Sequence, residues 1–224
     1  MRSKDIEDLK KSLKLSLNQR SILIGTLLGD GHLETQNKGR TYRLKIEHSI
    51  RQAFYVDWIY EQFIDWTRTG PKSKVKLLGK VRVENYSFQT LSVGQFRFYA
   101  KSFYRNGVKR VPSQIDKWLT PLALAVWFMD DGSAKSKLHR AIILNTQGFK
   151  RVDIDILIKA LKSKFGIEAQ IRKQSDGLQI LIVGKNAEQF FIIVRRYVFP
   201  NFDYKFGALV NKLPKKYRRR SKVS

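Results

Sequence analysis

Two aspartates stand out because each one ends an apolar run and each one precedes a glycine. Asp30 ends the run that starts at residue 23, Asp131 ends the run that starts at residue 124, and the two lie 101 residues apart. The C-terminal end of a helix carries partial negative charge, so a carboxylate there is disfavoured unless a cation lies nearby. The recurrence of this arrangement predicts a metal site built from Asp30 and Asp131.

A divalent cation held by carboxylates suits the hydrolysis of phosphodiesters. Mg²⁺ prefers oxygen ligands, and it can generate hydroxide near neutral pH and stabilise the charge that develops during hydrolysis. We expect Mg²⁺, with Mn²⁺ as a substitute, to be held by the two aspartates and by the backbone carbonyls of Gly29 and Asp130. Lys109 and Lys205 follow at corresponding places, where each could offset charge at the scissile phosphate.

Simpler interpretations of these residues remain open. An Asp-Gly pair is also an ordinary turn. Two lysines among 44 basic residues can match a pattern by chance. The three histidines show no metal-ligand spacing, so we expect them to be surface or strand-end residues.

Both apolar runs carry the start signals of helices. Ser16 followed by Gln19 fits a capping box, and Thr120 precedes Pro121 at the first helical position. Residues that are apolar on nearly every face belong in a core. The glycine after each aspartate is expected to take the positive φ of a helix C′ residue.

The chain divides into two halves that repeat one order: helix, two strands, helix, two strands, helix. Residues 41–48 alternate with period two, which predicts a strand. Residues 74–93 predict strands around turns at 78–80 and 84–85, and residues 167–183 predict a hairpin that turns at 175–177. We place the halves at residues 1–112 and 113–211, followed by a basic tail, 212–224. A pseudo-twofold protein matches a duplex with antiparallel strands.

The composition narrows the class of partner. Lys and Arg number 44 against 19 Asp and Glu, a net charge of +25, and the pI is near 10.3. Such an excess favours a polyanion, and +18 remains in residues 1–211 without the tail. No apolar run is long enough for a transmembrane helix, so we expect no membrane partner. With no cysteine, disulfides and zinc ribbons are excluded. That suits an intracellular protein of the cytoplasm or an organelle matrix.

The two apolar runs resemble the signature of the LAGLIDADG homing endonucleases. The first reads LIGTLLGDG and the second LAVWFMDDG, and the second lies in a longer run from Leu119 that is typical of this group. Residues 144–149 and the pair Tyr204-Lys205 also match places that the family uses. The resemblance covers about residues 16–207, and it is to the branch with two motifs in a single chain.

The resemblance implies an α+β fold of two pseudo-symmetric αββαββα halves whose antiparallel sheets form a DNA-binding saddle. It implies that Asp30 and Asp131 bind divalent metal and that Lys109 and Lys205 are the basic residues of the two sites. Glu47 and either Asn145 or Gln147 would hold water near the metals. The first motif departs from the signature at Gly29, and Arg110 directly follows Lys109, so the basic assignment there could shift by one residue.

Outward polar residues of the strands are the candidates for base reading, because Arg or Lys pairs with guanine and Gln or Asn with adenine. The candidates are Arg43, Lys45, Lys76, Arg82, Gln89, Gln170, Arg172 and Gln179. Each could equally contact a phosphate or only solvent.

The sequence therefore predicts a monomeric, Mg²⁺-dependent endonuclease that cuts double-stranded DNA at a long recognition site. Two alternatives use the same fold: a maturase that binds its host intron RNA, and a DNA-binding protein that does not cut. Two retained aspartates argue against the second alternative, because a pure binder has no use for carboxylates that face a polyanion.

Overall fold

The computed structural model describes residues 3–79 and 81–212, and it divides the chain into two compact units. The first unit ends at Gly107 and the second begins at Val108, whereas the sequence analysis placed the boundary at residue 112. Apart from Lys212, the predicted basic tail lies outside the described residues. None of the helices within the described ranges has the length and apolarity needed to cross a bilayer.

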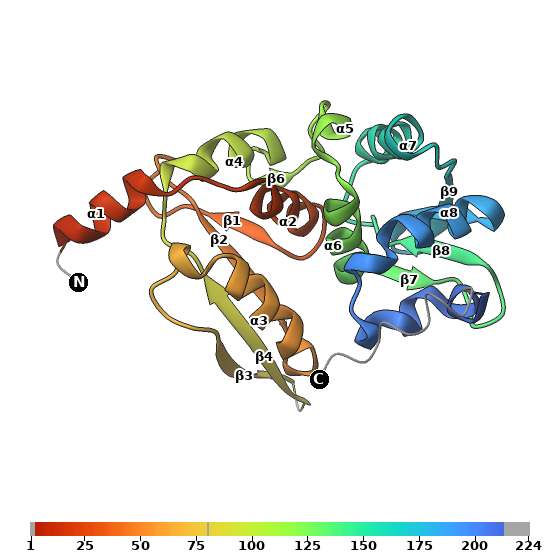
Figure 1. Cartoon of the computed structure of the whole chain (residues 1–224), viewed down its shortest axis with the longest axis horizontal. Coiled ribbons are helices and arrows are strands. Elements are labelled where there is room, and N and C mark those ends of the chain that lie inside the picture. The colour runs from red at the N-terminus through yellow and green to blue at the C-terminus, as the bar shows by residue number, and fades with distance from the viewer. Residues whose placement is uncertain (1–2, 80, 213–224) are drawn as a thin grey trace. The chain divides into compact units, whose positions relative to one another are not determined.

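The first unit contains an antiparallel sheet with the strand order β1-β2-β4-β3. Helix α3 packs against β2 and β4 (Figure 1). The elements are α1 (Ser3–Ser12), α2 (Leu17–Leu28), β1 (His32–Glu34), β2 (Arg43–Ser49), α3 (Ala53–Gln62), β3 (Lys72–Leu78), β4 (Val81–Gln89), α4 (Arg97–Phe103) and β5 (Tyr104–Arg105).

The register of this sheet separates a polar face from an apolar one. The alternation predicted for residues 41–48 is confirmed, because Leu44 and Ile46 are buried while Lys45 and Glu47 point to the other face. Lys45 lies opposite Gln89 on β4, and this pair fixes which residues of β4 share its face. The predicted turn at residues 84–85 is wrong: they lie inside β4, and the chain turns at Gly79 (φ 61°).

The second unit contains an antiparallel sheet with the order β7-β8-β10-β9. Helix α8 packs against β8 and β10. The elements are β6 (Val108–Lys109), α5 (Ile115–Trp118), α6 (Pro121–Asp131), β7 (Gly132–Ala134), β8 (Ala141–Leu144), α7 (Arg151–Phe165), β9 (Gln170–Gln174), β10 (Gly177–Val183), α8 (Gly184–Val194) and a 3₁₀ segment (Pro200–Lys212). The hairpin predicted for residues 167–183 is confirmed.

The two motif helices, α2 and α6, begin as the sequence predicts. Ser16 and Gln19 form the capping box of α2, and the Thr120 side chain accepts a hydrogen bond from the amide of Ala123 in α6. Both helices are buried for most of their length.

The prediction of positive φ for the glycines after the aspartates is wrong. Gly132 has φ −78°, and Gly31 is not among the residues with positive φ. Both glycines are needed for space instead. A Cβ on Gly132 would lie 2.1 Å from the Phe128 ring, and one on Gly31 would lie 2.7 Å from Thr26 Cβ.

Candidate functional site

Asp30 lies at the edge of an open hollow in the first unit. Its side chain is about half exposed, and Oδ2 lies 3.6 Å from Nδ1 of the buried His48. The hollow has a volume of about 520 Å³, and its lining includes Glu47, Lys45 and Lys76. The fold therefore brings four predicted site residues to one place. His48 was expected to be a surface or strand-end residue. It lies near the end of β2 but is buried, and its approach to Asp30 cannot be read from sequence spacing.

Glu47 is held by donors from two neighbouring strands. Lys76 Nζ donates to Oε1 at 2.6 Å and Asn85 Nδ2 donates to the same oxygen at 2.7 Å. The hydrogen bond from Lys76 is the main cause that lowers the pKa of Glu47 below its usual value, against an opposing effect of burial. Glu47 thus remains an anion beside Asp30, with Oε2 3.8 Å from Lys45 Nζ.

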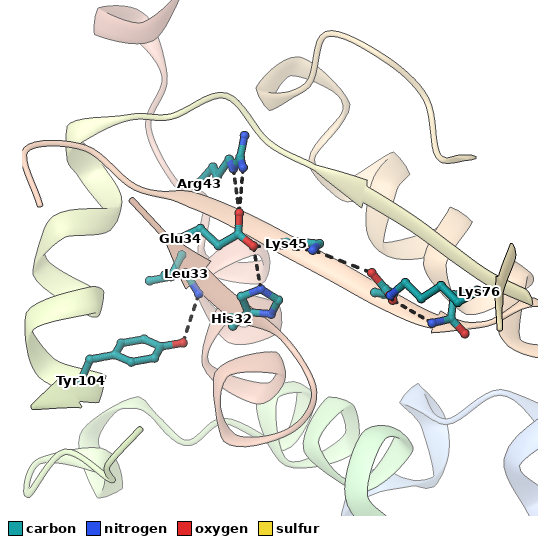
Figure 2. Close-up of polar contacts among 9 residues, drawn as sticks. His32, Leu33, Glu34, Arg43, Lys45, Lys76 and Tyr104 are labelled. Atoms are coloured by element: carbon teal, nitrogen blue, oxygen red, sulfur yellow. Dashed lines mark hydrogen bonds and ion pairs between the residues drawn. The ribbon is translucent and has the colours of Figure 1, made fainter. Parts of the chain in front are cut away.

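A second carboxylate on the same face, Glu34, was not predicted. Its Oε2 accepts hydrogen bonds from Nε and Nη2 of Arg43 at 3.1 and 2.8 Å. Its Oε1 lies 3.1 Å from His32 Nε2 and 3.6 Å from Lys45 Nζ (Figure 2). Burial would raise the pKa of Glu34, but the bonds from Arg43 and His32 and the charge of Lys45 lower it to about 2. The polar-apolar-polar order of residues 32–34 is the only sequence signal for this strand, and it is short.

In the second unit, a chain of amides leads to the end of the motif helix. The Asp131 carbonyl accepts hydrogen bonds from the backbone amide and the Nδ2 of Asn145, at 2.9 and 2.8 Å. Asn145 Oδ1 accepts from Gln179 Nε2 at 2.8 Å. Gln179 in turn accepts from Arg172 Nη1 at 3.4 Å. Gln147 instead donates to Asp176 at the hairpin turn, so Asn145 is the residue that lies beside Asp131.

Lys205 is buried, with 7% of its surface exposed. Its Nζ donates to the backbone carbonyls of Met129 and Asp130, the latter at 2.9 Å. A cation at the C-terminal end of a helix is stabilised by the macrodipole, and the Asp130 carbonyl that Lys205 binds belongs to the residue just before Asp131. The Asp130 carbonyl, predicted as a metal ligand, is therefore already bound to Lys205.

The structure distinguishes Lys109 from its neighbour Arg110. Arg110 Nε donates to Asp153 Oδ2 at 2.6 Å, and the Asp153 side chain is almost fully buried. Asp153 also accepts from the amide of Val111. Arg110 is thus committed to a structural ion pair, whereas Lys109 is half-buried on β6.

All but one of the predicted base-reading residues lie on the polar faces of the two sheets, and the exception is Arg82. In the second sheet Arg172 pairs with Gln179, and both share a face with Gln170. In the first sheet Arg82 pairs with Leu77, which places it on the face opposite to Lys45. Four predicted base-reading residues lie on the polar face of the first sheet, together with Glu47: Arg43, Lys45, Lys76 and Gln89.

Comparisons with known proteins agree over nearly the whole chain. Residues 20–190 match the model of the LAGLIDADG DNA endonuclease family. A probable intron-encoded endonuclease 1 of Wickerhamomyces canadensis is 30% identical over 91% of this chain and 90% of its own length. The cytochrome b mRNA maturase bI2 of Saccharomyces cerevisiae is 28% identical over 86% of this chain, which spans 48% of the maturase.

A solved structure gives the same result for the fold. The homing endonuclease I-WcaI, bound to its DNA recognition sequence, is 29% identical with a TM-score of 0.85. The similarity covers 92% of this chain and 93% of that protein.

Proposed function

The chain belongs to the LAGLIDADG DNA endonuclease family, and we propose that it cuts both strands of a long DNA site with divalent cations, one held at Asp30 and one at Asp131. The observation that carries this proposal is the similarity to I-WcaI, a DNA-bound homing endonuclease, along nearly the full length of both chains. The site-specific endonuclease activity is that of the family; the assignment of its residues here is our proposal.

The donors at the two aspartates fit Mg²⁺. Asp30 presents a half-exposed carboxylate to a polar hollow, and hard carboxylate oxygens are what Mg²⁺ prefers. The Gly29 and Asp130 carbonyls remain proposed ligands, and Lys205 Nζ takes one of the two acceptor positions of the Asp130 oxygen. When bound, the cation would supply hydroxide near neutral pH and stabilise the charge on the phosphate. Mn²⁺ offers similar chemistry and is the proposed substitute.

The chain's own residues would orient water and offset charge around each cation. Glu47 in the first half and Asn145 in the second would hold water, because each lies on the outward face beside its aspartate. Lys205 places its amine at the end of α6, and Lys109 on β6 is the proposed second basic residue. Preorganised charges of this kind lower the barrier where negative charge develops.

Double-stranded DNA is the proposed partner of the polar faces of both sheets. Arg43, Lys45, Lys76 and Gln89 would contact DNA from the first sheet, and Gln170, Arg172 and Gln179 from the second. With a net charge of +25, the affinity should fall steeply with salt, as counterion release requires. Because one chain carries both halves, we propose that a monomer cuts both strands.

A second candidate function is the binding of host intron RNA, which the similarity to the bI2 maturase favours. Such a role would not need the carboxylates of Asp30 and Asp131. The two functions are therefore separable by substitutions at these positions.

Selection of cleaved sites from a randomised DNA library, with and without Mg²⁺, tests the proposal. We expect Asp30→Asn and Asp131→Asn each to abolish double-strand cutting and to leave specific DNA binding in place. Asp65→Asn, an exposed carboxylate elsewhere in the first unit, is the matched control and should cut normally. Full cutting by either site variant would overturn the assignment. Tight binding of intron RNA without DNA cutting by the wild type would favour the maturase role.

A further inference from the structure

The polar face of the first sheet carries two carboxylates where a binder of polyanions is expected to be basic. Glu34 and Glu47 alternate with Arg43, Lys45 and Lys76 in one line of ion pairs across β1, β2 and β3. A carboxylate that faces phosphates weakens binding to any DNA. Its presence calls for a role other than affinity.

The geometry of the Glu34–Arg43 pair indicates that role. Both bonds to Glu34 come from the Nε and Nη2 side of the guanidinium. The guanidinium is planar with donors in a fixed fork, so this pair leaves the Nη1–Nη2 edge as a second fork. Two parallel donors match O6 and N7 of guanine.

We infer that Glu34 is a positioning residue for base reading, which fixes the Arg43 guanidinium so that its Nη1–Nη2 edge addresses a guanine of the bound duplex. This inference rests on the proposed function, because it takes the polar face of the first sheet as a DNA-contacting surface. Arg43 is 22% exposed, so its guanidinium is partly held within the sheet and partly presented outward.

We call the Glu34–Arg43 ion pair the clamp. The remaining contacts of Glu34 keep its carboxylate charged. Oε1 lies near His32 and Lys45, so both carboxylate oxygens face cationic or polar donors. The pKa of Glu34 is lowered to about 2. The negative charge of a nearby phosphate would raise this pKa, but from this low starting value the carboxylate stays ionised near neutral pH. A charged acceptor also makes the stronger bond to a guanidinium.

The test compares two charge-neutralising changes of equal size in the full chain. Glu34→Gln removes the charge of the clamp. Glu61→Gln removes a charge from the exposed side of α3, on the other face of the sheet. Each variant is used to select cleaved sites from a randomised library, and its affinity for an unrelated duplex is measured at fixed salt.

We expect Glu34→Gln to lose about tenfold in guanine preference at one position of the site while its affinity for the unrelated duplex rises. Glu61→Gln should keep the wild-type base profile. In an Arg43→Gln background, Glu34→Gln should change the base profile no further, because the two residues act as a unit. A merely structural role of Glu34 would lower cutting at all sites equally.

Two failures are distinguishable. If the wild type neither binds nor cuts any duplex, the proposed function fails. If the wild type cuts and Glu34→Gln cuts with an unchanged base profile, only the inference about Glu34 is overturned.

Discussion

The two sheets of this chain have the same strand order but build their outward faces from different chemistry. The halves can be aligned on their aspartates. His32 follows Asp30 by two residues and pairs with Lys45 on β2. Ser133 follows Asp131 by two residues and pairs with Ile143 on β8. In this alignment the ion pair of Glu34 and Arg43 corresponds to Lys135 and Ala141. The first half thus places an acid–base clamp where the second half has none.

The same alignment pairs Glu47 with Asn145. Glu47 is an anion held by a lysine and an amide, whereas Asn145 is a neutral link between Gln179 and the Asp131 carbonyl. In the second half the buried carboxylate of Asp153 lies on α7, outside the sheet, and is paired with Arg110. A duplicated architecture therefore constrains the backbone order far more strongly than the polar groups that it presents.

The glycines after the aspartates give the first expected difference between the halves. Gly132→Ala would set a Cβ 2.4 Å from the Phe128 carbonyl oxygen and against its ring. We expect it to destabilise the second half by about 3 kcal/mol or more, and Gly31→Ala to cost about 1–2 kcal/mol, since overpacking of this kind strains the core. Denaturant unfolding followed by hydrogen exchange in each half measures both. Equal costs would show that the two helix ends are packed alike.

The next contrast is between the stability contributions of a buried ion pair in the second half and a partly exposed one in the first. Asp153→Ala leaves Arg110 without its buried partner, which should cost about 3–5 kcal/mol. Glu34→Ala removes a pair that is 22–30% exposed and should cost about 1 kcal/mol. Urea midpoints of the two variants check the order. A cost for Glu34→Ala as large as that for Asp153→Ala would contradict the placement of the first half's charges on an open face.

Substitutions of the two proposed lysines should separate an effect on cutting from an effect on fold stability. Lys205→Met and Lys109→Met are each expected to slow cutting of one DNA strand by about 100-fold. Only Lys205→Met should also lower the stability of the fold, because its amine is buried on two carbonyls. Strand-specific nicking of a labelled duplex and thermal melts measure these effects, with the exposed Lys185→Met as control. Normal nicking by Lys205→Met would remove it from the catalytic proposal.

The smallest predicted effect is one of pH. The folded pKa of Glu34, about 2, lies below its ordinary value of 4.5. Its contribution to stability is therefore present above pH 4.5 and is lost as the pH falls from 4.5 towards 2. Glu34→Gln should flatten the acid limb of a stability–pH curve in this window, and Glu61→Gln should leave it unchanged. An identical acid limb for Glu34→Gln and the wild type would contradict the ion-pair account.

The sequence predicted what local chemistry determines. Caps at Ser16 and Thr120 and the alternation of residues 41–48 depend on neighbours in the chain, and the structure confirms all of them. The roles of the glycines after Asp30 and Asp131 were misread, because glycine allows both a positive φ and a close approach of neighbouring atoms, and the sequence does not distinguish the two.

Longer-range features could not be read in this way. Arg82 was assigned to the polar face, but its face depends on where the hairpin turns, and the turn expected at residues 84–85 is absent. The bonds of Lys205 to the carbonyls of Met129 and Asp130 join residues far apart in the chain. Glu34 was missed because β1 spans only His32–Glu34, too short for a periodic signal.

The clamp between Glu34 and Arg43 has a practical consequence for retargeting by directed evolution. A library that varies position 43 alone keeps an anion facing the substrate with no guanidinium to neutralise it, so most of its members would be penalised for a reason unrelated to the new base. The two codons should be randomised together, as one specificity module.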